Sequence, residues 1–328
     1  MLSSHLAFAL LSAMAMASPV PQKRAETTCT DINHCEFKGC WTEMDGQSWC
    51  SPDDGNTAST FSLNEILFDT GMDLKKRKAY TEGIPSSLVL EAIGRSPTFT
   101  GGAEGTGSIL NTMSLLAKLS ATHAIEMRNV ISWGVEIGVE SDRSVTSSFY
   151  YTGEGSAKNG KIVFSASNVL DGSQEQSMGF VAHEMGHAVF DHGGYSADLQ
   201  NSLSGQGDLA NQDIYGNLAG MVNEPFAGIF AQRSTLYQHI DNPDKSKCYW
   251  NRLVWSWDVN SLFRTPDEGY WKYYGLHNPK SYEGFQPLLD IGVNVLLPRL
   301  AEEYGLTNDP YLRAGIEAYV SKDAECKD

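Results

Sequence analysis

Two histidines and a glutamate stand at a spacing that suits a metal centre. Residues 181–189 read Val-Ala-His-Glu-Met-Gly-His-Ala-Val and contain the pattern H-E-x-x-H, formed by His183, Glu184 and His187. On a helix, residues four apart lie one turn apart on the same face, so both imidazoles can reach one metal ion. Imidazole nitrogens suit zinc, and two helical histidines leave the tetrahedral site open for a third protein ligand and a water. The spacing therefore predicts Zn2+ bound by His183 and His187.

The glutamate between the histidines suits a proton-transfer role. Glu184 adjoins the first histidine, where its carboxylate can reach a water on the metal without binding the metal itself. Zinc lowers the pKa of such a water towards neutrality, and the carboxylate can take its proton during attack on a carbonyl. We therefore expect Glu184 to act as general base. The alternative is a structural one, in which carboxylates satisfy the two histidines and no metal is bound.

A third ligand is expected from a second helix. Asn223 is a good N-cap, and Pro225 is tolerated in a first helical turn, so Glu224 should begin a helix and reach the open side of the metal. The alternative for Glu224 is a first-turn charge that matches the helix dipole. His192 follows His187 by five residues, an offset that turns it away from the metal face if the helix continues.

These segments resemble a known peptidase family. The active-helix sequence, the pair Tyr215-Gly216 and the Asn223-Glu224 helix are similar to the gluzincin zinc metallopeptidases, in particular the anthrax lethal factor-like and Pro-Pro endopeptidase group. The similarity covers residues 174–231 and no more. It implies zinc ligation by His183, His187 and Glu224, with Glu184 as base and Tyr215 stabilising the oxyanion.

The chain departs from that group in two places. Tyr215 lies farther from Glu224 than the group's spacing, and Gly228 occupies a position where some gluzincins carry an acid that supports the ligands. The alternative for Tyr215 is an ordinary packed tyrosine.

The surrounding pattern predicts an α+β fold with a zincin-like, two-lobed architecture and a mainly helical C-terminal lobe. Ser108 is expected to cap a helix, and strands are expected over 130–139, 149–152 and 161–166, the last two forming a hairpin. By the same resemblance, the 161–166 strand stands where zincins place the edge strand that binds extended substrate. Helices follow from Gln174 onward. Strands first and helices later favour the α+β class.

The N-terminus reads as a secretion signal. An apolar run over 6–16 precedes an A-x-A-like cleavage site, and the dibasic pair at 23–24 resembles a processing site. We expect a signal peptide over 1–17, a propeptide over 18–24, a cysteine-rich segment over 25–57, a catalytic domain over 58–240 and a helical lobe over 241–328. Secretion favours disulfides for the six cysteines, with two bridges among the first four and one joining Cys248 to Cys326; a zinc knuckle is the alternative.

The net charge limits the partners. A formal charge of −16 argues against nucleic acid or an anionic membrane surface, because both need a basic face. The basic run 75–78 is expected to be a solvated face. Together these features predict a secreted, extracellular, monomeric zinc metalloendopeptidase that acts on protein or peptide substrates. The alternative is a secreted zinc-binding effector or recognition protein without turnover.

Overall fold

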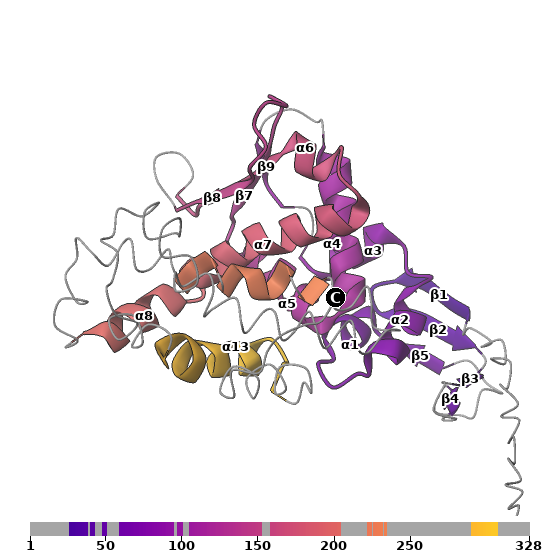
Figure 1. The fold of residues 1–328 in the computed structure, drawn as a ribbon. Helices are drawn as coiled ribbons and strands as arrows, with labels where there is room; N and C mark the ends of the chain where they lie inside the picture. Colours follow the sequence, from indigo (N-terminus) through magenta and orange to yellow (C-terminus); the bar gives the residue numbers. More distant parts are fainter. Residues whose placement is uncertain are drawn as a thin grey trace, which may run out of the picture.

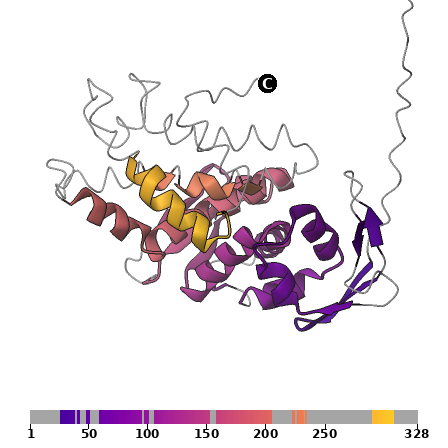
Figure 2. The same ribbon diagram turned by 90° about the horizontal axis from the view of Figure 1, so that it is seen from below.

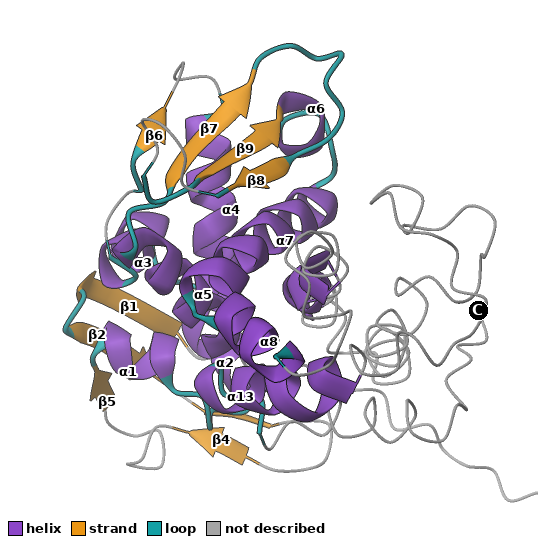
Figure 3. Cartoon of the chain, turned by 90° about the vertical axis from the view of Figure 1, so that its left-hand side faces the viewer, coloured by secondary structure: helices purple, strands orange, loops and turns teal. Residues whose placement is uncertain are grey.

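The computed structural model describes eleven stretches of the chain. They are residues 26–38, 40–42, 48–50, 59–94, 97–100, 105–152, 158–204, 222–224, 226–231, 233–234 and 290–307. These residues form a mixed α and β structure in which helices predominate and the sheets are small (Figures 1 and 3). Mixed α and β structure was predicted, and this coarse prediction is confirmed.

The described elements follow one another in short pieces. The helices are α1 Leu63–Phe68, α2 Leu74–Thr81, α3 Ser86–Ala92, α4 Thr106–Leu119, α5 Ala121–Ser132, α6 Ala166–Val169, α7 Gln174–His192, α8 Tyr195–Leu203, the π-helical turn η4 Gly292–Leu296 and α13 Leu297–Glu303. The strands are β1 Glu26–Asp31, β2 His34–Lys38, β3 Cys40–Thr42, β4 Ser48–Cys50, β5 Ser59–Phe61, β6 Phe99–Thr100, β7 Glu136–Glu140, β8 Phe149–Tyr151 and β9 Lys161–Ser165. Residues 222–224 and 226–231 are also helical.

A four-stranded sheet lies on one side of the long helices. Its order is β6-β7-β9-β8, with β6, β7 and β9 parallel and β8 antiparallel to β9. The predicted hairpin is confirmed, because Phe149 pairs with Val163 and Tyr151 with Lys161. The prediction that residues 161–166 form the edge strand is wrong. β9 is enclosed by β7 and by its own hairpin partner, which leaves β8 at the edge (Figure 3).

The helices α4, α5 and α7 form the core beneath this sheet. The predicted helix at Ser108 is confirmed, but it begins at Thr106 after Gly105, so Ser108 lies inside it and its hydroxyl donates to the Val169 carbonyl. The strand predicted over 130–139 is wrong in its first part. Residues 130–132 continue α5, and Val130 is fully buried on that helix. Burial has overridden the preference of β-branched residues for strands.

The basic run 75–78 is not a uniformly solvated face. Arg77 is 1% exposed, and its guanidinium donates to the carbonyls of Ile66, Leu67, Ala117 and Lys118. Those carbonyls belong to the last turns of α1 and α4, where intrahelical partners are lacking. One arginine therefore caps two helix C-termini, and the prediction of a solvated face is wrong for this residue.

The N-terminal segment forms small sheets at one end of the molecule (Figure 2). β1, β2 and β5 make a three-stranded antiparallel sheet, and β3 pairs with β4. A disulfide joins Cys29 to Cys35 across β1 and β2. Cys40 lies opposite Cys50 in the β3–β4 register. The predicted bridge between Cys248 and Cys326 falls outside the described residues.

The predicted helical C-terminal lobe, residues 241–328, is described only over 290–307. There η4 and α13 pack their buried face, including Leu296, Leu300 and Tyr304, into the common hydrophobic core. Among the described residues, no helix is both long enough and apolar enough to cross a membrane.

Candidate metal centre

The helix α7 holds the H-E-x-x-H residues rigidly. It begins with a capping box, in which Ser173 and Gln176 satisfy each other's backbone N–H groups. Its apolar side is fully packed, with Val181, Met185 and Val189 all at 0% exposure. A helix whose residues from Ser177 to Phe190 are mostly buried positions its side chains with little freedom.

Three ligand-type atoms converge beside α7. The Nε2 atoms of His183 and His187 lie 3.1 Å apart, and Oε2 of Glu224 lies 3.3 Å from the first and 3.6 Å from the second. All three come from predicted ligands, although Glu224 is 37 residues beyond His187 in the chain. Within the described part of the chain, these residues form a group that could hold a metal ion. We call His183, His187 and Glu224 the candidate metal centre.

Asn223 orients the second histidine. Its amide oxygen accepts a hydrogen bond from Nδ1 of His187 at 3.0 Å, which leaves Nε2 to face the other two ligand atoms. Asn223 was predicted to be an N-cap, and this is wrong, because Val222 before it is already helical. Its side chain instead supports the candidate metal centre, as outer partners of ligating histidines commonly do.

Gly186 lets the two ligand-bearing helices approach each other. A Cβ at this position would stand 2.9 Å from the Cα of Ala227 and 2.9 Å from the Phe230 ring. Such distances are shorter than real Cβ contacts, so only glycine fits here without a shift of one helix. The orange segment over 222–234 accordingly runs close beside α7 (Figure 1). The small residue within H-E-x-x-H is therefore part of the geometry that brings Glu224 to the histidines.

Glu184 lies in a different environment from the ligands. Its side chain is 4% exposed, and its Oε2 atom is buried with no hydrogen-bond partner in the described residues. Burial raises the pKa of Glu184 to about 7, opposed by the nearby His183 and reinforced by the Glu224 charge. A carboxyl with such a pKa can both accept and release a proton near neutral pH.

The pKa values of His187 and Glu224 are shifted in the opposite sense, downward. Burial lowers the pKa of the His187 imidazole to about 4, with His183 adding to this effect. The neutral imidazole, which is the metal-binding form, therefore prevails at neutral pH. Burial acts to raise the pKa of Glu224, but the hydrogen bond from His183 and the electrostatic interaction with the two imidazoles outweigh it, so the pKa falls below its ordinary value. Glu224 is thus held as an anion.

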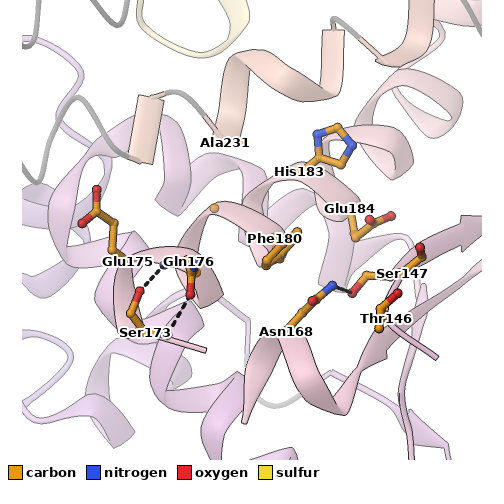
Figure 4. Close-up of a pocket in the computed structure, with 12 residues that line it drawn as sticks. Thr146, Ser147, Asn168, Ser173, Glu175, Gln176, Phe180, His183, Glu184 and Ala231 are labelled. Carbon is orange, nitrogen blue, oxygen red and sulfur yellow. Dashed lines mark hydrogen bonds between the residues drawn. The ribbon is translucent and has the colours of Figure 1, made fainter. Parts of the chain in front are cut away.

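A cavity of about 790 Å³ opens beside the candidate metal centre (Figure 4). His183 and Glu184 line its inner end, and Gln176, Gly179 and Phe180 continue the same face of α7. The opposite wall includes residues 146–148, which lead into β8, and Asn168 of α6. The volume falls within the 300–1,000 Å³ usual for ligand pockets.

Two further residues were weighed in the sequence. His192 ends α7, where its Nε2 donates to the Asn159 carbonyl at 2.8 Å and its ring stacks on Trp133. It is not part of the candidate metal centre, as its spacing predicted. Tyr215, proposed from the family resemblance, lies outside the described residues.

Some features of the site could not be found from the sequence. The role of Asn223 was missed because an asparagine before a helix reads first as a cap. The role of Phe180 was missed because nothing in the sequence shows that this apolar residue, one turn before His183 and Glu184, lines a cavity, where it is 37% exposed. No family model, no curated protein and no solved structure matches this chain.

Proposed function

We propose that this protein is a secreted zinc-dependent endopeptidase of gluzincin type. The observation that carries the proposal is the convergence of His183, His187 and Glu224 next to a buried, unpaired carboxylate oxygen of Glu184, all beside an open cavity. A purely structural group of histidines and a carboxylate would need neither the base nor the cavity.

The separations between the ligand atoms suit a tetrahedral ion. Atoms that lie about 2.0–2.2 Å from a tetrahedral zinc are roughly 3.3–3.6 Å from one another. The observed separations are 3.1, 3.3 and 3.6 Å. Two imidazoles and one carboxylate are also the donor set of His₂Glu catalytic zinc sites, which leave a fourth position open. The residues present therefore fit the ion.

The residues divide the work of peptide hydrolysis between them. When bound, zinc supplies Lewis-acid chemistry, since it acidifies water and polarises a carbonyl. Glu184 takes a proton from the attacking water, the water oxygen bonds to the carbonyl carbon, and Glu184 returns the proton to the leaving nitrogen as the C–N bond breaks. Asn223 keeps the His187 ring in its orientation throughout. The cavity wall and α7 hold the peptide on either side of the reacting bond.

The proposal is tested on the mature chain beginning at Ala25. We expect about one zinc per chain by elemental mass spectrometry and cleavage of a random peptide library. Glu184→Gln should retain the zinc and lower kcat/KM by about 10² to 10⁴. Glu302→Gln, an exposed carboxylate on α13, is the matched control and should change neither quantity.

Three outcomes would count against the proposal. Full activity in Glu184→Gln would exclude the base role, and loss of its zinc would make Glu184 a ligand. A zinc-loaded protein that cleaves no peptide in the library would favour a binding protein without turnover.

A further inference from the structure

The cavity beside the candidate metal centre extends along one face of α7. Beyond Glu175 at the outer rim, its lining on this helix runs from Gln176 through Gly179 and Phe180 to His183 and Glu184, at intervals of three, one, three and one residues. These intervals trace one helical face over nine residues, which rise by about 12 Å. A peptide in extended conformation rises about 3.3 Å per residue, so roughly three residues on one side of the reacting bond can lie along this face.

The face offers an apolar surface in its middle. Phe180 lies one turn before His183 and Glu184, and its ring is 37% exposed, drawn in Figure 4 between Glu184 and Gln176. It is one of three large exposed hydrophobic side chains in the described part of the chain, and of these it alone lines the cavity. Exposed aromatic surface in a cavity gains free energy when another apolar group covers it.

Gly179 provides the space next to that ring. A Cβ at Gly179 would meet no atom within 4 Å, although the residue lies on α7 in the wall of the cavity. The space that a side chain would take at this position is therefore open to a ligand. Since the position is not sterically closed to larger residues, the cavity can be filled from it without disturbing the fold.

The charged side chains of the cavity contribute little to the choice of ligand. Among the described lining residues, the charged side chains other than the candidate ligand His183 are the carboxylates Glu175 and Glu184, and there is no lysine or arginine. Glu175 is exposed at the outer rim, so solvent screens its attraction for a basic side chain. The hydroxyls of residues 146–148 can hydrogen-bond a peptide backbone on the opposite wall. Apolar contact with Phe180 is thus the main source of discrimination.

We propose that this cavity is a specificity site that takes a bulky apolar or aromatic side chain of a peptide substrate, packed on Phe180 beside Gly179. The inference rests on the proposed function, because it assumes that peptide is bound at the candidate metal centre. It adds the class of substrate and names the residues that select it. Alanine is bound weakly because it leaves the Phe180 ring uncovered, and aspartate is bound weakly because its carboxylate would lose hydration against this apolar ring.

A binding experiment tests the specificity site without depending on peptide cleavage. The hydroxamate group of a peptide hydroxamate binds to a bound metal ion. Two series of short peptides are used, one with the hydroxamate at the N-terminus and one with it at the C-terminus. The variable residue next to the hydroxamate then lies on one side of the metal in the first series and on the other side in the second. Probes carrying Phe, Leu, Lys, Asp or Ala are titrated into the zinc-loaded full chain by calorimetry. In one of the two series, we expect Phe and Leu to bind about 10-fold or more tighter than Ala, and Asp to bind weakest.

Two variants with matched controls test the residues. Gly179→Leu should fill the cavity and lower the affinity for the Phe probe by about 10- to 200-fold. The control is Gly107→Leu on α4, where a Cβ also meets nothing within 4 Å, and it should leave this affinity unchanged. Phe180→Ala should remove the preference for Phe over Ala, whereas Val295→Ala, another exposed apolar residue, should keep it. Zinc content should be unchanged in all four, and each variant should still unfold in a single cooperative transition.

Each outcome bears on a different statement. Equal affinity for all probes in both series, or an unchanged Phe preference in Gly179→Leu, would overturn the specificity site. If the preference appears but the wild-type chain cleaves no library peptide, the specificity site stands and the peptidase proposal fails. If the library is cleaved without preference for bulky apolar residues, the peptidase proposal stands and the specificity site is overturned.

Discussion

The amide oxygen of Asn223 lies 3.0 Å from Nδ1 of His187 and fixes the face that this imidazole turns to the other ligands. The same asparagine directly precedes Glu224, so one turn of helix supplies both a ligand and the support for another. This arrangement ties the positions of two ligands together, because a shift of that turn would move both. The Asn-Glu pair is therefore a single structural unit of the candidate metal centre.

Removing the acceptor should weaken metal binding. We expect Asn223→Ala to reduce zinc affinity by about 10- to 100-fold, since a freed His187 ring loses its orientation. Asn223→Asp keeps an acceptor oxygen in place and should restore most of the affinity. Competition with a chromogenic chelator measures both variants. Equal affinities for Asn223→Ala and the wild type would contradict the supporting role.

The close approach of the two helices at Gly186 gives a second prediction. Gly186→Ala should lower the free energy of unfolding by about 1–3 kcal/mol and reduce zinc affinity, because the new methyl group pushes Ala227 and hence Glu224 away. Gly228→Ala is the control, since a Cβ there meets nothing within 4 Å and the residue adjoins Ala227. Urea unfolding and zinc titration check the pair. Equal unfolding free energies and equal zinc affinities in the two variants would contradict the prediction.

The buried Glu184 carboxyl should make the metal-free protein less stable as pH rises. Burial sets its pKa at about 7, against 4.5 for the ordinary group, so between these values the folded chain keeps a proton that the unfolded chain has lost. The free energy of unfolding therefore falls through this window, by on the order of 3 kcal/mol in total. Glu184→Gln has no such proton to lose.

The difference in unfolding free energy between metal-free Glu184→Gln and the wild type should thus grow in favour of the variant from about pH 4 to pH 8. Urea unfolding in the presence of a chelator measures it. Glu302→Gln, with an exposed carboxylate, should run parallel to the wild type over the same range. A constant difference for Glu184→Gln would show that this carboxyl is not held protonated by burial.

The sequence was most informative about residues that lie on the same helix. The i, i+4 spacing of His183 and His187 and the apolar stripe beside them were enough to place both imidazoles on one face. The convergence of Glu224 needed more than spacing, because nothing local fixes how a helix 37 residues later packs on α7. The structure brings the acid of the Asn-Glu pair to the two histidines, and this contact depends on Gly186 and on the buried side of both helices.

The errors share a physical cause. Val130 has a strand preference, yet it lies on α5, where burial against the core decides the conformation. Arg77 stands in a basic run, yet it is buried because two helix C-termini offer carbonyls to it. The edge position of β8 depends on which strand pairs with β7, a non-local choice. Local patterns predict elements, whereas tertiary packing decides burial and order.

The zinc content of two purified variants tests the central claim most directly. Glu224 lies 3.3 and 3.6 Å from the two histidine nitrogens, whereas His192 hydrogen-bonds the Asn159 carbonyl away from them. We predict that Glu224→Ala loses zinc and activity together and that zinc no longer raises its melting temperature, while His192→Ala keeps its zinc and a large share of activity. Normal zinc in Glu224→Ala with depleted zinc in His192→Ala would contradict the assignment.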